Sequence, residues 1–138
     1  MHVDTTTPIL NVTDLTATFE WFERFGWERS FDWGEPPTFG GVRFGECEIM
    51  LCQGAQGGRG RSSSATTFGV DGDERGDGGV WLFLRVDDAD AFFHRCRAEE
   101  IEITFAPTDM PWGYRECHVR HPDGHVFRLA QFLPGEGD

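Results

Sequence analysis

The stretch NVTDLTATFEWF, residues 11–22, is repeated in outline by RVDDADAFFHRC, residues 85–96. Aligning the two superposes three pairs of residues: Val12 on Val86, Asp14 on Asp88 and Phe19 on Phe93. In each copy a strand-like run ends, an acidic side chain can cap a helix, and large apolar residues follow at helical spacing. This internal repeat predicts a chain that contains two copies of one structural module.

The sequence around each copy predicts the same order of elements. In the first half, strands are expected at 5–12, 27–33, 38–44 and 47–53, with a helix capped by Thr13 or Asp14 and ended by Gly26. In the second half, strands are expected at 80–86, 101–106, 113–120 and 125–132, with a helix capped by Asp87 or Asp88. The predicted fold class is therefore α+β, with two βαβββ modules whose helices cover one sheet face.

A polar segment rich in Gly and Ser, residues 54–78, separates the two halves. Its glycines do not follow a strand and open a helix, so they do not indicate a phosphate-binding loop. We expect a flexible linker between a first module at 5–53 and a second module at 79–133, within a single domain of residues 1–138.

Composition and charge narrow the classes of partner. The chain has 24 acidic and 12 basic residues, all of the latter arginine, and a formal net charge of −12. This charge disfavours nucleic acid and anionic membranes; it favours a cationic ligand, or simply keeps the protein in solution. No apolar run has the length of a membrane span, and no signal peptide is evident, so a cytoplasmic location is expected. The four cysteines form no C-x-x-C pair and are expected to be reduced and mostly buried.

Two motifs near the end of the chain carry a family resemblance. PWGYRE at 111–116 and HPDGHVFRL at 121–129, after the repeated V-x-D-L/A helix starts, resemble the vicinal oxygen chelate superfamily of glyoxalases, dioxygenases and bleomycin-resistance proteins. The resemblance covers nearly the whole chain, and its local match is to the bleomycin-resistance branch. It implies that the two modules form a curved mixed sheet around a cavity, in a homodimer.

Strand alternation predicts which side chains face away from the helices. Aliphatic residues such as Leu82 and Leu84 suit the helix side of their strand, so Trp81, Phe83 and Arg85 take the opposite side. The charged members of the opposite set either orient a ligand or neutralise one another across neighbouring strands. The candidate ligand-binding residues are Thr7, Phe44, Glu48, Met50, Trp81, Phe83, Arg85, Trp112, Glu116, His118 and Arg128.

Metal-using members of the resembled superfamily have ligands on the first and fourth strand of each module. The resemblance implies that Thr7, Met50, Trp81 and Arg128 occupy these positions, and none of the four is a good ligand for a divalent ion. A second arrangement would use the three histidines of the last motif. His118 is expected within a strand, whereas His121 and His125 are expected to be exposed at a hairpin turn, which does not bring the three together. No metal and no cofactor are expected.

The residues therefore predict a metal-free protein that binds a small molecule, cationic or aromatic. The resemblance to bleomycin-resistance proteins implies that it sequesters an antibiotic. The inward arginines leave room for a ligand with an anionic or carbonyl group. One alternative is a glyoxalase- or dioxygenase-like metalloenzyme with relocated ligands, which would use His118 and Glu116. Another is a module without a ligand that acts through its interface.

Overall fold

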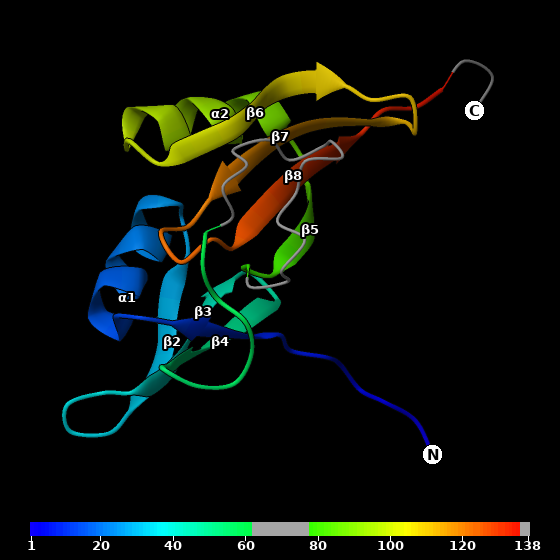
Figure 1. Ribbon diagram of the computed structural model, residues 1–138. Helices are drawn as coiled ribbons and strands as arrows, with labels where there is room; N and C mark the ends of the chain where they lie inside the picture. The colour runs from blue at the N-terminus through cyan, green and yellow to red at the C-terminus, as the bar shows by residue number, and fades with distance from the viewer. Residues whose placement is uncertain (62–77, 136–138) are drawn as a thin grey trace. The chain divides into compact units, whose positions relative to one another are not determined.

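The computed structural model describes residues 1–61 and 78–135 (Figure 1). It divides into two compact units, Met1–Arg59 and Gly60–Asp138, and each is described by itself. The expectation of a flexible linker falls largely on residues 62–77, which lie outside the described residues. The described start of that linker makes backbone contacts, because the Gly54 amide donates to the Val12 carbonyl and the Gly60 amide to the Asp123 carbonyl.

Each unit contains one helix and one four-stranded mixed sheet, and this confirms the predicted fold class. The first unit contains β1 (Ile9–Val12), α1 (Leu15–Arg24), β2 (Glu28–Trp33), β3 (Phe39–Phe44) and β4 (Cys47–Gln53). The second contains β5 (Trp81–Val86), α2 (Ala89–Ala98), β6 (Glu102–Asp109), β7 (Tyr114–Arg120) and β8 (Val126–Phe132). The strand orders are β1-β4-β3-β2 and β5-β8-β7-β6, with one parallel pair in each sheet, β1 with β4 and β5 with β8.

Two strands differ in length from their predictions: one begins directly after a proline, and the other contains one. The strand expected at 5–12 begins only at Ile9, because Pro8 lacks an amide proton and contributes only its carbonyl, which accepts from the Met50 amide. The strand expected at 101–106 continues to Asp109 and includes Pro107. β6 is an edge strand whose pairing with β7 shifts register twice, and such strands tolerate proline.

The repeat seen in the sequence extends to strand register. Ile9 lies beside Met50 in the first sheet, and Phe83, at the equivalent position, lies beside Arg128 in the second. The helix starts are also equivalent: the side chains of Asp14 and Asp88 accept from the amides of Ala17 and Ala91. In addition, a glutamine side chain near the end of the fourth strand accepts from the first amide of the helix in each unit: Gln53 from Leu15 and Gln131 from Ala89.

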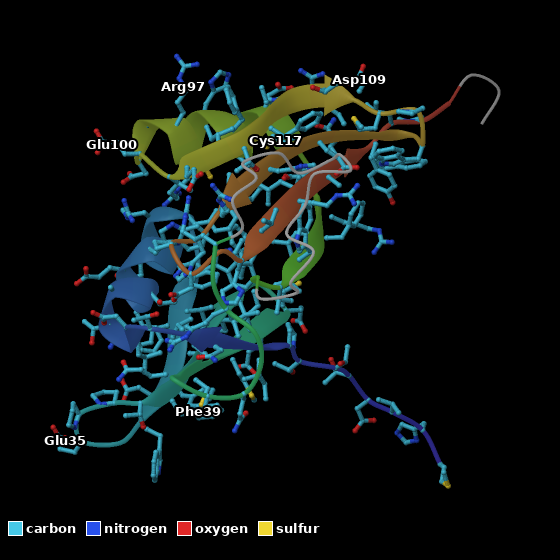
Figure 2. All side chains as sticks on the ribbon, viewed as in Figure 1. Glu35, Phe39, Arg97, Glu100, Asp109 and Cys117 are labelled. Atoms are coloured by element: carbon cyan, nitrogen blue, oxygen red, sulfur yellow. The ribbon has the colours of Figure 1, made fainter. Side chains whose placement is uncertain are left out.

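Each helix packs against the sheet of its own unit. α1 buries Phe19 and Phe22 in the first unit, and Gly40 allows close approach because a Cβ there would overlap the Phe19 ring. In the second unit, Cys96 of α2 and Cys117 of β7 are both buried, and Cys117 lies on the α2 side of the sheet (Figure 2). All four cysteines are free, as expected, but Cys47 is exposed and Cys52 only partly buried. Among the described residues, neither helix is long and apolar enough to cross a membrane.

Candidate ligand-binding site

A buried carboxylate organises the face of the second sheet that lies opposite α2. Glu116 on β7 is fully buried, and its Oε1 accepts from Arg128 Nε at 2.8 Å and from His118 Nε2 at 2.9 Å. Its Oε2 accepts from Arg128 NH2 at 2.9 Å and from the indole N–H of Trp112. Both oxygens therefore accept two hydrogen bonds each, and the paired contact with Arg128 is the bidentate geometry that binds carboxylates most strongly.

The protonation states follow from this arrangement. Burial raises the pKa of the Glu116 carboxyl, but hydrogen bonds from Arg128, His118 and Trp112 outweigh that effect and hold its pKa below the usual range. Burial lowers the pKa of His118, and the hydrogen bond to Glu116 only partly opposes this. At neutral pH Glu116 is therefore ionised and His118 is neutral, so the His118 Nε2–H donates to the carboxylate.

Aromatic rings surround the arginine of this network. The Arg128 guanidinium carbon lies 5.2 Å from the centre of the Phe83 ring and 5.7 Å from that of Trp112. These distances allow cation–π contacts with both rings. His118 stacks on Phe105 with ring centres 4.8 Å apart. Because its N–H is held by Glu116, Trp112 is oriented by the network although its ring is 48% exposed.

The exposed part of this face is a row of aromatic side chains with one further arginine. Trp81, Phe83 and Arg85 alternate along β5 with the half-buried Leu82 and Leu84, which confirms the alternation predicted for this strand. Arg85 Nε donates to the Tyr114 hydroxyl at 3.2 Å. The Tyr114 ring contacts Phe83 and Phe132 edge-on, with centres 5.2 and 5.8 Å away. We define the aromatic face as Trp81, Phe83, Arg85, Trp112, Tyr114, Arg128 and Phe132.

Tyr114 and Phe132 were not among the candidate residues from the sequence. Tyr114 lies two residues before Glu116, and alternation places both on the same side of β7. The sequence therefore contained the signal that identifies Tyr114. Alternation from Arg128 likewise places Phe132 on this side of β8, and register adds that it lies beside Tyr114. His118 and Glu116, in contrast, lie beneath this face and are fully buried, so they support the exposed rings rather than line the surface themselves.

The candidates of the first module form a different environment. Glu48 and Met50 are half-buried on one side of β4, and Glu48 accepts from the Ser30 hydroxyl at 3.1 Å. Thr7 precedes β1 and belongs to no strand. Phe44 lies on the opposite face from Met50, contrary to expectation, because it pairs with Cys47 and its ring packs edge-on against Trp27, which joins the α1 aromatic cluster.

The residues at the metal-ligand positions implied by the resemblance do not fit a divalent ion. In the second module Arg128 is a permanent cation that binds Glu116, and Trp81 offers only an indole. Both Glu116 oxygens are engaged, which leaves this carboxylate poorly suited to become a relocated ligand. Within residues 1–61 and 78–135, no three His, Cys, Asp or Glu side chains gather closely enough to hold a metal ion.

The expectation that His121 and His125 are exposed was wrong. Both are buried, because backbone from distant parts of the unit covers the turn between them. A Cβ on Gly79 would overlap the Gly124 backbone, and a Cβ on Gly124 would overlap the carbonyl of Gly60. Both rings also accept backbone hydrogen bonds: His125 Nδ1 from the Val80 amide at 2.9 Å, and His121 Nδ1 from the Asp123 amide at 3.0 Å.

Comparison with solved structures finds the same fold in several other proteins. A bleomycin-binding protein solved with bleomycin is 22% identical, with a TM-score of 0.66 over 94% of this chain and 98% of that one. TioX from Micromonospora sp. ML1 is 21% identical, with a TM-score of 0.73 over 95% and 100%. A genomically encoded fosfomycin-resistance protein from Listeria monocytogenes is 15% identical, with a TM-score of 0.66 over 95% and 94%. At these identities the likeness shows the fold alone.

The chain was compared with curated protein sequences and with models of protein families, and only the second comparison finds a match. No curated protein sequence matches the chain. The model of the Glyoxalase/Bleomycin resistance protein/Dioxygenase superfamily matches residues 2–129, which is nearly the full length. Together with the duplicated βαβββ modules, this match shows that the chain belongs to the Glyoxalase/Bleomycin resistance protein/Dioxygenase superfamily.

Proposed function

We propose that this protein binds a small aromatic molecule on the aromatic face and acts by sequestration, as an antibiotic-binding protein of the bleomycin-resistance type. The observation that carries the proposal is the pairing of Glu116 with Arg128. The ion pair occupies the carboxylate that a metalloenzyme would need as a metal ligand. It also fixes the Arg128 guanidinium beside the rings of Trp112 and Phe83. What remains accessible is a set of rings suited to stacking, with few polar groups to orient a ligand.

A metalloenzyme with Glu116 and His118 as relocated ligands is the alternative. His118 Nε2 donates to Glu116, so that nitrogen is not available to a metal while the pair is intact. Both side chains are also fully buried beneath the rings. Metal analysis of the freshly purified protein separates the two functions: a divalent ion bound in stoichiometric amount, and lost in His118→Ala, would overturn the binding proposal.

We also propose that the protein is a homodimer and acts in the cytoplasm. The dimer is supported by the membership of the superfamily and by the large exposed rings that each chain carries. The cytoplasm is supported by the four free cysteines, which an oxidising compartment would favour as disulfides. Analytical ultracentrifugation of the full chain tests the first statement, and fractionation of the producing cells tests the second.

The binding proposal is tested by a thermal-shift titration of the full chain with bleomycin and with 2-naphthoate as a simple planar probe. A ligand that binds only the folded state raises the unfolding midpoint, increasingly with its concentration. Trp81→Ala should abolish the shift, because it removes an exposed ring from the aromatic face. The matched control is Trp33→Ala, which removes an exposed ring from β2 of the other module. The absence of any shift with both probes would contradict the proposal.

A further inference from the structure

The arginines of the described chain differ in how their charge is compensated. Arg29, Arg61, Arg115, Arg120 and Arg128 each lie within 4 Å of a carboxylate oxygen. Among the described residues, Arg43, Arg59, Arg85 and Arg97 have no carboxylate oxygen within this distance, and of these four only Arg85 belongs to the aromatic face. Its guanidinium contacts the Tyr114 hydroxyl and the Phe83 ring. The chain as a whole carries a net charge of −12. A cation without a carboxylate partner, beside the rings of the aromatic face, therefore favours a ligand that carries a negative charge.

The geometry of Arg85 leaves its terminal nitrogens available. Nε is used by Tyr114, which holds the guanidinium beside the aromatic row. Register places Ala130 next to Arg85, so the neighbouring strand contributes only a methyl group at this point. The two terminal nitrogens have no acceptor recorded among the described residues, and they form the planar fork that binds a carboxylate with two parallel hydrogen bonds.

The spacing along β5 connects this fork to the rings. Trp81, Phe83 and Arg85 project to one side of the strand, and alternate residues lie about 7 Å apart. A flat ring system lying over Phe83 or Trp81 can therefore bring an acidic substituent to Arg85. The other arginine of the face, Arg128, is neutralised by Glu116, so Arg85 is the cation that decides which ligand charge is preferred.

We propose that the aromatic face binds a planar aromatic acid, with its rings over Trp81 and Phe83 and its carboxylate on the terminal nitrogens of Arg85. The inference rests on the proposed binding function and makes it specific, because it assigns the sign of the ligand's charge. Tyr114 acts as a positioning residue: its hydroxyl accepts from Arg85 Nε and restricts the guanidinium to the orientation in which both terminal nitrogens face the ligand.

The test uses three probes with the same rings and different charges: 2-naphthoate, 2-naphthamide and 2-naphthylmethylammonium. Affinities are measured by isothermal titration calorimetry on the full chain near neutral pH and low salt. We expect naphthoate to bind about tenfold more tightly than the amide, since a charge-assisted bidentate contact at an exposed site is partly screened by solvent. The ammonium probe should bind more weakly than the amide.

Substitutions then assign the preference to one side chain. Arg85→Gln should reduce naphthoate affinity to that of the amide and leave amide affinity nearly unchanged. Tyr114→Phe keeps the ring and should reduce the preference for naphthoate only partly. The matched control is Arg97→Gln, which makes the same change in net charge at an exposed arginine on the outer side of α2, near the Phe93 ring (Figure 2). It should leave all three affinities unchanged.

The outcomes separate this inference from the function on which it rests. Equal affinity for naphthoate and the amide, or tighter binding of the ammonium probe, would overturn the inference and leave aromatic binding intact. No binding of any probe would overturn both. If Trp81→Ala also converts a dimer into monomers while no probe binds, a second copy of the chain occupies the aromatic face, and both proposals are wrong.

Discussion

The two modules share the same order of strands and helix, but most equivalent positions on one sheet face are apolar in the first module and polar or charged in the second. Register aligns Phe31, Phe39, Gly41 and Met50 of the first sheet with Phe105, Glu116, His118 and Arg128 of the second. In the first module these positions are apolar or empty: Phe31 and Phe39 contact each other with centres 5.5 Å apart, and Gly41 provides space for the Phe31 ring. In the second, a buried carboxylate, a histidine and an arginine form one hydrogen-bonded network.

Each set of side chains is stable as a unit. A buried carboxylate is tolerated in the second module because four hydrogen bonds and a guanidinium compensate its desolvation. An unsubstituted Gly41 is tolerated in the first because a ring fills the space that His118 takes in the second. The duplicated backbone therefore accepts two solutions, but an exchange of single residues between them should fail.

The largest effect is expected from giving the second module the first module's residue at one position. Arg128→Met leaves Glu116 buried without its cation, and unfolding free energy should fall by roughly 3–5 kcal/mol, measured by urea denaturation. The complete exchange, Glu116→Phe with His118→Gly and Arg128→Met, should lose less than Arg128→Met alone. If the exchange loses more than the single substitution, the two sets are not interchangeable units.

A matched ion pair on the same sheet provides the control for this result. Arg120→Met also removes an arginine from a glutamate, but Glu102 is exposed and can be solvated after the change. Its loss should be about 1 kcal/mol or less.

The second expected effect is a dependence of stability on pH that belongs to the second module. Burial lowers the pKa of His121 to about 4, with Asp123 opposing and His125 and Arg61 reinforcing the shift. The unfolded chain takes up this proton near pH 6.5, so it binds more protons than the folded chain between about pH 6.5 and pH 4. Unfolding free energy should therefore fall by about 1.4 kcal/mol for each pH unit lost in this window.

Substitution assigns this dependence. His121→Gln should flatten the pH profile of the urea midpoint, while His94→Gln on the exposed side of α2 should not change its slope. The lowered pKa of His118 acts in the same direction. The first module, residues 5–53, contains no histidine, and His125 is the remaining buried histidine of the second module. A profile that survives the combined His118→Gln, His121→Gln and His125→Gln would therefore contradict this assignment.

A smaller loss of stability is expected when the space above Gly41 in the first module is filled. A Cβ at Gly41 would lie 2.6 Å from the Phe31 ring, so Gly41→Ala must displace that ring and should cost roughly 1–3 kcal/mol by urea denaturation. Gly78→Ala, where a Cβ would meet no heavy atom of the described residues within 4 Å, is the control and should be nearly neutral. Equal stability of the two variants would show that the ring moves freely and that the position is not packed.

The smallest loss of stability is expected when the glutamine acceptor at the start of either helix, a feature that both modules share, is removed. Gln53→Ala and Gln131→Ala each remove the acceptor for the first amide of a helix, so each should cost about 1 kcal/mol, and the two costs should agree. Glu20→Ala on the exposed side of α1 is the control. A cost at one glutamine only would show that the duplicated helix start has diverged in energy although its geometry is the same.

The order of elements and most strand faces could be predicted from the sequence, although the face of Phe44 could not. Apolar periodicity, the two helix starts and the alternation along β5 are local, because each depends on residues a few positions apart. The sequence left each cap open between two residues, and the structure selects Asp14 and Asp88. The same local reasoning placed Glu116, His118 and Arg128 on one side of their strands, and it placed Trp81, Phe83 and Arg85 on one side of a single strand.

Which of these side chains contact one another, and which are exposed, depends on how distant segments fold together. Glu116 and Arg128 are joined by register across β7 and β8, and the Trp112 N–H reaches them from a turn whose direction no periodicity encodes. His121 and His125 are buried because Gly60 and Gly79, distant in sequence, cover their turn. Burial and partnership depend on segments brought together by folding, and for this reason the binding face could be outlined from the sequence, but its network could not.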